Sequence, residues 1–239
     1  MRKSKPTKAD RIGPRRDILA ADVLDKAATL FAARGFAATS LQDVADLVGL
    51  SRTSIYHYFD SKDALLQELV RGVTTQAAQI FDDLDRETAL APSAKVREAA
   101  RRLVLWVSDP HTHFKLVDRS ELELPSAIAA VHRQAKRRVL AGMSKLIEAG
   151  IASGEFRALD ARIAAFTIIG MCNWTAWWFQ PTGEKTAKEI ADAIAEQAVA
   201  SLQRPSGATG ATDVKSLTNA IRAELDLIDS VHGMKRTKP

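Results

Sequence analysis

The chain has 239 residues, of which 46% are hydrophobic, and it carries 34 Lys and Arg against 29 Asp and Glu. This length suits one large domain or two small ones, and the hydrophobic content excludes an intrinsically disordered chain. The single cysteine, Cys172, excludes an intrachain disulfide and a cysteine-built zinc site, and it suggests a reducing, cytoplasmic location. No apolar run reaches the ~18 residues of a membrane span, and the basic N-terminus lacks a signal-peptide core, so a soluble, non-exported protein is expected.

The excess of positive charge lies at the two ends of the chain. Residues 1–17 hold seven basic and two acidic side chains, and three more basic residues stand near the C-terminus. Pro6, Gly13 and Pro14 disfavour a helix, so residues 1–16 are expected to form a flexible basic arm. Such an arm either keeps the protein soluble or follows the phosphates of a nucleic acid.

Apolar residues recur at intervals of three and four along almost the whole chain, which predicts an all-α fold. A first helix is expected from Asp17 to Arg34, with Gly35 as its stop. Ser40 and Asp43 form a capping box for a second helix that ends at Gly49. Ser51 caps a third, over about 52–59. Two short helices joined by a tight glycine-containing turn are typical of a helix-turn-helix, although a plain helical hairpin has the same spacing.

The remaining pattern predicts a larger helical body. Its helices are expected at about 62–84, 96–107, 125–154, 161–179 and 187–202, with a short segment at 111–119 between the second and the third. The composition of residues 204–212 is that of a linker, and an additional amphipathic helix is predicted at 213–232. The domain boundaries expected from this pattern are 17–77 for the helix-turn-helix unit and 78–203 for the body.

The third helix carries side chains suited to reading DNA. A recognition helix presents its N-terminal residues to base edges in the major groove. Arg52 can bond guanine bidentately and the Thr53 methyl can contact thymine, while Tyr56, His57 and Tyr58 follow one turn later. Lys62 opens the next helix, where a cation beside free backbone N–H groups suits a phosphate.

The specific residues sharpen this prediction. Residues 23–66 resemble the TetR family of transcriptional repressors. The resemblance rests on Leu30-Phe31, Arg34-Gly35-Phe36, Ala38-Thr39-Ser40, Asp43-Val44-Ala45, Gly49-Leu50-Ser51, Ile55-Tyr56-His57-Tyr58-Phe59 and Ser61-Lys62-Asp63-Ala64-Leu65-Leu66. It implies an all-α homodimer that binds a palindromic operator and is released by a small molecule bound in a larger C-terminal ligand-binding and dimerisation domain. The residues that it implies contact DNA are Ser40, Arg52, Thr53, Tyr56, His57, Tyr58 and Lys62.

A tryptophan-rich segment marks the body. Trp174, Trp177 and Trp178 share one helix face, as expected either for a dimer seam or core, or for the wall of a ligand pocket. Residues 148–202 are similar to an acyl-CoA-responsive branch of the same family. This likeness rests on Ala152-x-Gly154-Glu155-Phe156-Arg157, Gly170-Met171-x-Asn173-Trp174 and Pro181-Thr182-Gly183.

That likeness implies arginines that pair with coenzyme A phosphates, the alternative for each being a solvated helix face. The candidates are Arg119, Arg133, Arg137 and Arg138. The ligand-binding set that we predict is Phe114, Arg119, Met143, Asn173, Trp174 and Trp177.

Other chemistry has little support in the sequence. His111 and His113 could ligate a metal but lack a cysteine partner nearby, and Cys172 is expected to be a packed thiol rather than a redox sensor. No phosphate loop, nucleophile elbow or zinc-protease motif is present, so an enzyme is not expected and no cofactor is implied. A sequence-tolerant architectural DNA-binding protein remains an alternative, as does, more remotely, an enzyme that uses the C-terminal pocket. The sequence identifies neither the effector nor the operator, and it does not separate repression from activation.

Overall fold

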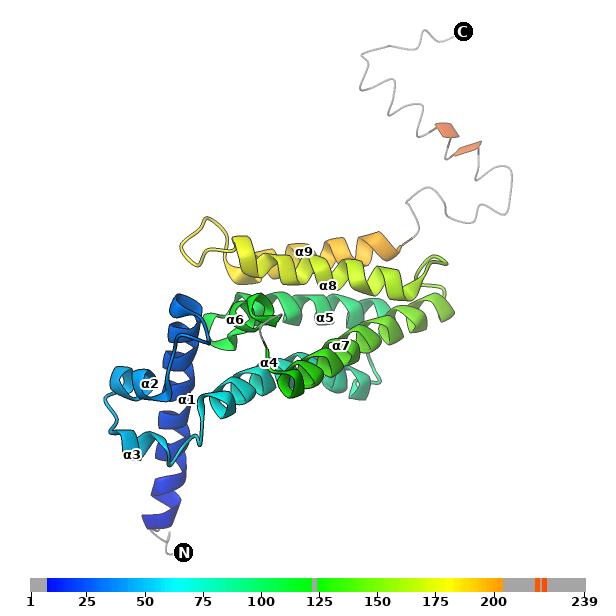
Figure 1. The fold of residues 1–239 in the computed structure, drawn as a ribbon. Helices are drawn as coiled ribbons and strands as arrows, with labels where there is room; N and C mark the ends of the chain where they lie inside the picture. The colour runs from blue at the N-terminus through cyan, green and yellow to red at the C-terminus, as the bar shows by residue number, and fades with distance from the viewer. Residues whose placement is uncertain (1–7, 122–123, 204–217, 220, 223–239) are drawn as a thin grey trace, which may run out of the picture.

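The computed structural model describes residues 8–121, 124–203, 218–219 and 221–222. Within these residues all regular structure is helical, which confirms the all-α prediction (Figure 1). The expected linker and the additional C-terminal helix lie outside the described residues, except for 218–219 and 221–222, which are helical. None of the described helices is long and apolar enough to cross a lipid bilayer.

The N-terminal unit consists of α1 (Lys8–Arg34), α2 (Leu41–Val48), α3 (Arg52–Ile55) and the start of α4 (Lys62–Arg86). Three serines begin its helices as N-caps, because each hydroxyl accepts a backbone N–H of the first turn: Ser40, Ser51 and Ser61. Asp43 completes the predicted capping box. Gly49 ends α2 with φ 77°, a left-handed conformation that glycine adopts without steric cost.

Helix α1 starts earlier than its sequence suggests. It begins at Lys8 rather than Asp17, so residues 8–16, expected as part of a flexible arm, are helical. The prediction gave too much weight to Pro14. Proline inside a helix removes one backbone donor and crowds the carbonyl four residues earlier, but its fixed φ is close to the helical value, and α1 continues through Pro14.

The third helix is shorter than predicted. Regular α-helix covers only Arg52–Ile55, and the chain continues to Phe59 as a tight turn. The backbone N–H of Tyr58 and that of Phe59 both bond to the oxygen of Ile55, each at 3.0 Å. This short element is anchored to the core by the fully buried Ile55 and by Phe59, which is partly buried against the same cluster.

Helix α4 belongs to both parts of the molecule. It starts beside α3 and runs into the body, so the predicted boundary at residue 77 falls inside a continuous helix. The helices that complete the body are α5 (Pro92–Ser108), η1 (Pro110–Thr112), α6 (Phe114–Arg119), α7 (Ser126–Ala152), α8 (Ala161–Trp178) and α9 (Ala187–Leu202). One hydrophobic cluster joins the N-terminal unit to α6 and the start of α7, and a second fills the body.

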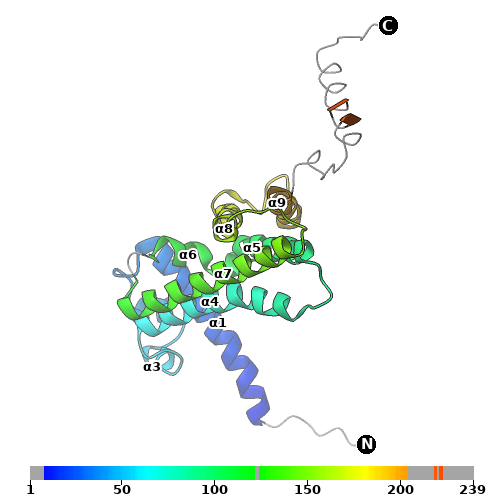
Figure 2. The same cartoon turned by 90° about the vertical axis from the view of Figure 1, so that its right-hand side faces the viewer.

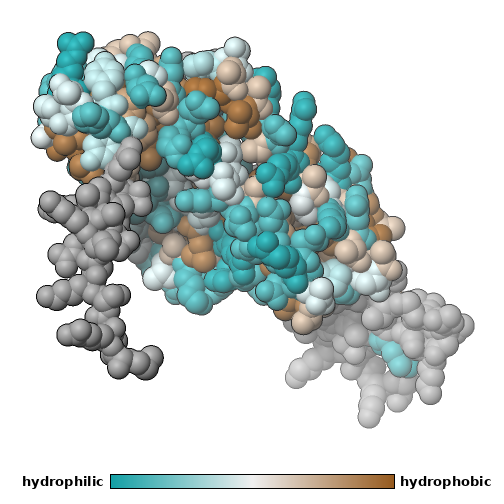
Figure 3. Space-filling model, turned by 90° about the horizontal axis from the view of Figure 1, so that it is seen from below, coloured by the Kyte–Doolittle hydropathy of each residue, from teal (hydrophilic) through white to brown (hydrophobic). Residues whose placement is uncertain are grey.

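The body is layered. Helices α8 and α9 lie side by side over α5, and α4 and α7 form the opposite side (Figure 2). The underside of the molecule is mostly hydrophilic, with hydrophobic residues in small groups (Figure 3). Helix α6 lies where α1, α4 and α8 approach one another, which places it between the two parts.

Candidate nucleic-acid interface and ligand pocket

The start of α3 and the turn after it form an exposed polar surface. Arg52, Thr53, Tyr56 and His57 are exposed, and Tyr58 is half-buried. The Ser51 cap fixes where the helix begins, and Ile55 faces the core from the opposite side. The predicted reading residues are therefore presented together on one short, anchored element.

Two further predicted residues adjoin this surface. A shallow recess is lined by Ser40, Tyr56 and Lys62, together with residues of the segments 37–41 and 60–61. The Ser40 hydroxyl already donates to Asp43 at 2.5 Å, so its role within the chain is that of a cap. The same hydrogen bonds hold the pKa of Asp43 below its ordinary value, since they favour the charged carboxylate.

Lys62 has a structural role that the sequence did not suggest. Its Nζ donates to three backbone oxygens, those of Phe36 at 2.8 Å, Ala37 at 3.1 Å and Thr39 at 2.9 Å. It also lies 4.5 Å from the centre of the Phe36 ring. An ammonium group has three N–H donors, so a phosphate would have to replace one of these bonds or share its hydrogen.

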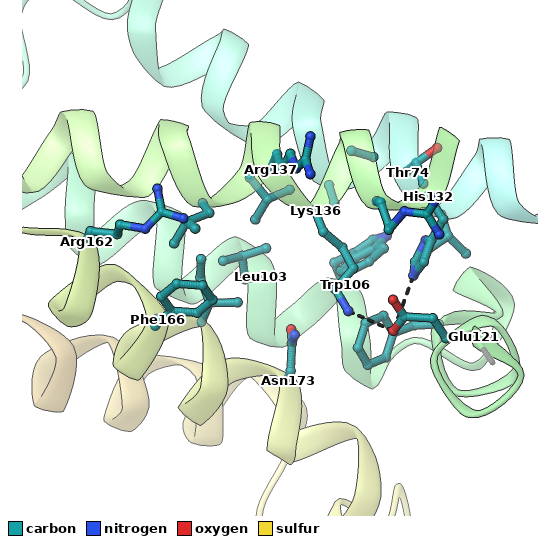
Figure 4. Close-up of a pocket in the computed structure, with 18 residues that line it drawn as sticks. Thr74, Leu103, Trp106, Glu121, His132, Lys136, Arg137, Arg162, Phe166 and Asn173 are labelled. Atoms are coloured by element: carbon teal, nitrogen blue, oxygen red, sulfur yellow. Dashed lines mark hydrogen bonds and ion pairs between the residues drawn. The ribbon is translucent and has the colours of Figure 1, made fainter. Parts of the chain in front are cut away.

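The body holds a cavity of about 430 Å³ between α4, α5, α6, α7 and α8, within the size range of small-molecule sites (Figure 4). Its walls are mainly apolar. They include Val73, Leu103, Trp106, Phe114, Val139, Leu140, Phe166 and Ile169. The Trp106 ring packs edge-on against Phe114 at 5.2 Å, and its indole N–H donates to Gln76 at 2.9 Å, which fixes the position of the ring.

Charge is distributed unevenly around this pocket. Arg133, Lys136, Arg137 and Arg162 line it, against one carboxylate, Glu121. Lys136 pairs with Glu121 at 2.7 Å. Among the described residues no ion pair engages the other three cations. An apolar cavity bordered by three guanidinium groups without carboxylate partners favours a ligand with an apolar part and an anionic part.

One buried polar side chain in the pocket is unsatisfied. His132 is 6% exposed, and neither of its ring nitrogens has a hydrogen-bond partner among the described residues. Its Nε2 lies 4.0 Å from a Glu121 oxygen. Burial lowers the pKa of His132, the Glu121 carboxylate opposes this change and the Lys136 ammonium adds to it, so the ring is neutral at pH 7.

The predicted ligand-binding set is placed only partly in the pocket. Phe114 and Asn173 of this set line it. Two of the arginines expected to pair with coenzyme A phosphates, Arg133 and Arg137, line it as well. Met143 is fully buried in the second core cluster and Arg119 is exposed elsewhere. Arg138 pairs with Asp82 at 3.3 Å. Trp174 and Trp177 do not line the pocket, because they lie on the outer face of α8.

His132, Arg162 and Phe166 line the pocket but were not predicted from the sequence. Helical periodicity marks which residues are buried, but it does not show which of two buried faces borders a cavity. A histidine on the apolar side of α7 was the one available signal for His132, because a polar residue on a buried face needs a partner.

The outer face of α8 is apolar and exposed. Its side chains retain large exposed fractions: Ile163 65%, Trp174 65%, Trp177 43% and Trp178 48%, while Phe166, which is 57% exposed, lies at the edge of this face and also lines the pocket. A contiguous apolar face of this kind on a protein surface marks an interaction site. The tryptophan segment was expected to form either a dimer seam or core, or a pocket wall, and the exposure of its tryptophans fits an interface better than a pocket wall.

Two histidines next to the pocket contact the N-terminal unit through Asp25. His113, the residue before Phe114, has a left-handed backbone (φ 57°), and its Nε2 lies 3.0 Å from Asp25 of α1. His111 lies 3.6 Å from the same carboxylate. Burial lowers the pKa of His113, and Asp25 opposes this change. No cluster suited to a metal ion occurs among the described residues, and in the structure these two histidines face a helix of the N-terminal unit.

Comparison with known proteins agrees with both parts of this description. The family model for bacterial regulatory proteins of the tetR family matches residues 23–69, and that for the tetracyclin repressor-like C-terminal domain matches residues 89–202. The HTH-type transcriptional repressor KstR2 of Rhodococcus jostii is 30% identical over 181 residues, which are 71% of this chain and 84% of that protein.

Solved structures share the fold. The ketosteroid transcriptional regulator KstR2 of Mycobacterium tuberculosis has a TM-score of 0.70 at 23% identity, covering 80% of this chain and 95% of that one. AibR in complex with isovaleryl coenzyme A and operator DNA has a TM-score of 0.65 at 23% identity, covering 75% and 97%. With its helix-turn-helix unit, its helical body and these relatives, the chain belongs to the TetR family, whose members are transcriptional regulators and not enzymes.

Proposed function

We propose that this protein is a homodimeric repressor that leaves its operator when an acyl-CoA thioester enters the body pocket. The observation that carries the effector class is an apolar cavity bordered by Arg133, Arg137 and Arg162, none of which forms an ion pair among the described residues. An acyl chain suits the cavity walls, and the coenzyme A phosphates suit the guanidinium groups. The likeness to KstR2 repressors and to AibR, solved with isovaleryl coenzyme A, supports the same class.

The outer face of α8 supports the proposed dimer. Burying the exposed tryptophans Trp174, Trp177 and Trp178 against a second copy would remove a large apolar area from water. A two-fold dimer places two recognition elements at a fixed separation, and its operator is therefore expected to be an inverted repeat.

Release requires a link between pocket and DNA surface, and two elements provide one. Helix α4 lines the pocket with Val73 and Thr74 and carries Lys62 at its start. Phe114 lines the pocket next to His113, which pairs with Asp25 of α1. A ligand that displaces Phe114 or shifts α4 would move these contacts and change the separation of the two recognition elements.

The direct test is fluorescence anisotropy of the full-length protein on DNA from upstream of its own gene, with scrambled DNA of the same length as control. We expect binding to the native fragment alone at moderate salt, and release by isovaleryl, hexanoyl or octanoyl coenzyme A but not by coenzyme A alone. Equal affinity for both DNAs would overturn specific binding. Specific binding that no thioester weakens would overturn the effector class.

A double substitution checks the pocket assignment. Arg137→Ala with Arg162→Ala should raise the thioester concentration needed for release by about tenfold or more, since each charge-assisted bond contributes about 1.5–3 kcal/mol in a desolvated site. Operator affinity without thioester should not change. Arg97→Ala with Arg101→Ala, which removes two arginines of α5 outside the pocket, is the matched control.

A salt titration distinguishes the specific repressor from a sequence-tolerant architectural DNA-binding protein. If the basic N-terminal residues supply all of the binding, replacing all seven with Gln should abolish it: Arg2, Lys3, Lys5, Lys8, Arg11, Arg15 and Arg16. For a specific repressor the same change should only reduce the slope of log affinity against log salt, by up to about 0.9 for each phosphate that is no longer neutralised.

A further inference from the structure

The polar end of the ligand pocket contains a side chain that the fold leaves unsatisfied. His132 lies on α7, its side chain is 7% exposed, and both ring nitrogens lack a hydrogen-bond partner in the described part of the chain. It lines the pocket, and Figure 4 shows it on the same side as Glu121, away from Arg162 and Phe166.

An unsatisfied buried polar group is unfavourable for folding. Most buried polar atoms are paired, and an apolar residue of similar size at the same place would avoid the cost of removing the ring nitrogens from water. No hydrogen bond among the described residues uses the polarity of His132, and the nearest carboxylate oxygen, of Glu121, is 4.0 Å from Nε2. A ligand in the pocket is the partner that would use it.

The surroundings of His132 determine what such a ligand presents. Glu121 and Lys136 neutralise each other at 2.7 Å, and the other charged groups near the ring are one of each sign, the Asp118 carboxyl and the Arg133 guanidinium. The unpaired cations include Arg137, one and a half turns further along α7, and Arg162 at the other end of the pocket. A neutral imidazole offers one N–H donor and one acceptor nitrogen, which matches an uncharged oxygen rather than a carboxylate.

We propose that His132 binds a keto or hydroxyl oxygen on the apolar chain of the effector, so that the pocket selects an oxygenated chain over a saturated one. This proposal rests on the proposed function in one respect, that the body pocket is the site where the effector binds. It adds a second point of recognition to the anionic one. The anionic end of the ligand lies toward Arg137 and Arg162, and the oxygen is inserted at the end that Glu121 and Trp106 enclose.

The spacing along α7 indicates where the oxygen should be. His132 and Arg137 are five residues apart, which corresponds to a rise of about 7.5 Å along the helix and a rotation of about 140° around it, so the rise is a lower limit on the distance between the two groups. This length is about that of six carbon–carbon bonds in an extended chain. Octanoates with a keto group at carbon 5, 6 or 7 therefore sample the required distance from a carboxylate that occupies the anionic end.

The experiment measures binding of these acids without coenzyme A and without DNA. Calorimetric titration of the full-length protein with octanoate and with 5-, 6- and 7-oxooctanoate should show at least one oxo acid binding about tenfold more tightly than octanoate. His132→Leu should reduce that preference to less than about twofold, and His132→Gln, which keeps a donor and an acceptor, should retain part of it.

Controls separate recognition from structure. Thr74→Val removes a pocket hydroxyl that already donates to the Arg71 oxygen at 3.0 Å, so it should leave the preference intact. The unfolding midpoint of unliganded His132→Leu should equal or exceed that of the unchanged protein. A marked fall would show that His132 is satisfied within the protein and would contradict the proposal.

The remaining outcomes are decisive and independent of the thioester test. Equal binding of octanoate and all oxo acids, or failure of every acid to bind, would overturn the assignment of His132 whatever octanoyl coenzyme A does to the operator complex. A preference that depends on His132 would support it even if the thioester leaves DNA binding unchanged, and the proposed effector class alone would then fail.

Discussion

The ammonium nitrogen of Lys62 lies 2.8 Å from the backbone oxygen of Phe36 and donates to two further oxygens of the segment between α1 and α2. This lysine therefore ties the start of α4 to the element that precedes α2. The segment that follows α1 and the start of α4 are therefore held together beside the helix-turn-helix. The position of the recognition surface depends on this contact.

Replacing Lys62 with Met should lower both stability and DNA affinity. Loss of the charge-assisted bonds is expected to reduce the free energy of unfolding by about 1.5–3 kcal/mol, measured by urea denaturation. Affinity should fall similarly on all DNA sequences, because the whole surface is displaced. If Lys62 acts through the fold, the slope of log affinity against log salt stays the same, whereas removal of a cation that neutralises a phosphate would lower it by about 0.9.

The matched control for this change is Lys188→Met. Lys188 forms an exposed pair with Asp192 within α9, far along the chain from α4. Exposed pairs of this type contribute about 0.3–0.5 kcal/mol, so neither stability nor DNA binding should change appreciably. A similar reduction in both variants would contradict the role assigned to Lys62.

Local signals in the sequence predicted the helical elements well. The Ser40–Asp43 capping box and the helix end at Gly49 appear where the residues indicated, because each acts within one turn of backbone. Contacts between segments that are distant along the chain could not be predicted from the sequence. The partners of Lys62 are 23 to 26 residues away, and the pocket combines residues of α4 through α8.

Base recognition should depend on Arg52. This side chain is exposed at the first position of α3, where a guanidinium can reach a guanine edge. Arg52→Ala is expected to cost about 1–3 kcal/mol on the preferred operator and to relax discrimination at one position in each half-site. Selection from a randomised operator library measures this directly. A uniform decrease in affinity with unchanged base preference would assign Arg52 to the phosphates instead.

Two glycines with opposite surroundings provide a packing test. A methyl group at Gly150 of α7 would come within 2.1 Å of the buried Phe156 ring, whereas one at Gly72 of α4 meets nothing within 4 Å. Gly150→Ala should destabilise by about 1–3 kcal/mol because the core is overpacked. Gly72→Ala should stabilise by about 0.5–1 kcal/mol, since alanine is the better helix former. Equal effects in denaturation experiments would contradict the packing around Phe156.

Charge on the outer face of α8 should dissociate the proposed dimer. Trp177→Glu would put a carboxylate among exposed apolar side chains, and analytical ultracentrifugation is expected to show a shift toward monomer with at least a tenfold weaker dimer constant. Leu90→Glu, at a separate exposed leucine between α4 and α5, is the control and should leave the mass unchanged. If the protein without substitutions is itself a monomer, the outer face of α8 is not a dimer seam.

Cys172 should behave as a packed thiol. It is fully buried, its sulfur lies 3.7 Å from the Ala100 oxygen, and burial raises its pKa from 9.0 to about 12. At neutral pH the native thiol is protonated and inaccessible, so reaction with a chromogenic disulfide should proceed only as fast as the protein opens. The raised pKa means that the folded state holds this proton more tightly than the unfolded state. Its contribution to stability is complete below about pH 9 and is lost as the pH rises toward 12. The unfolding midpoint of the unchanged protein should therefore fall more steeply above about pH 9 than that of Cys172→Ala. Rapid labelling of the native protein at neutral pH would contradict this and favour a redox sensor.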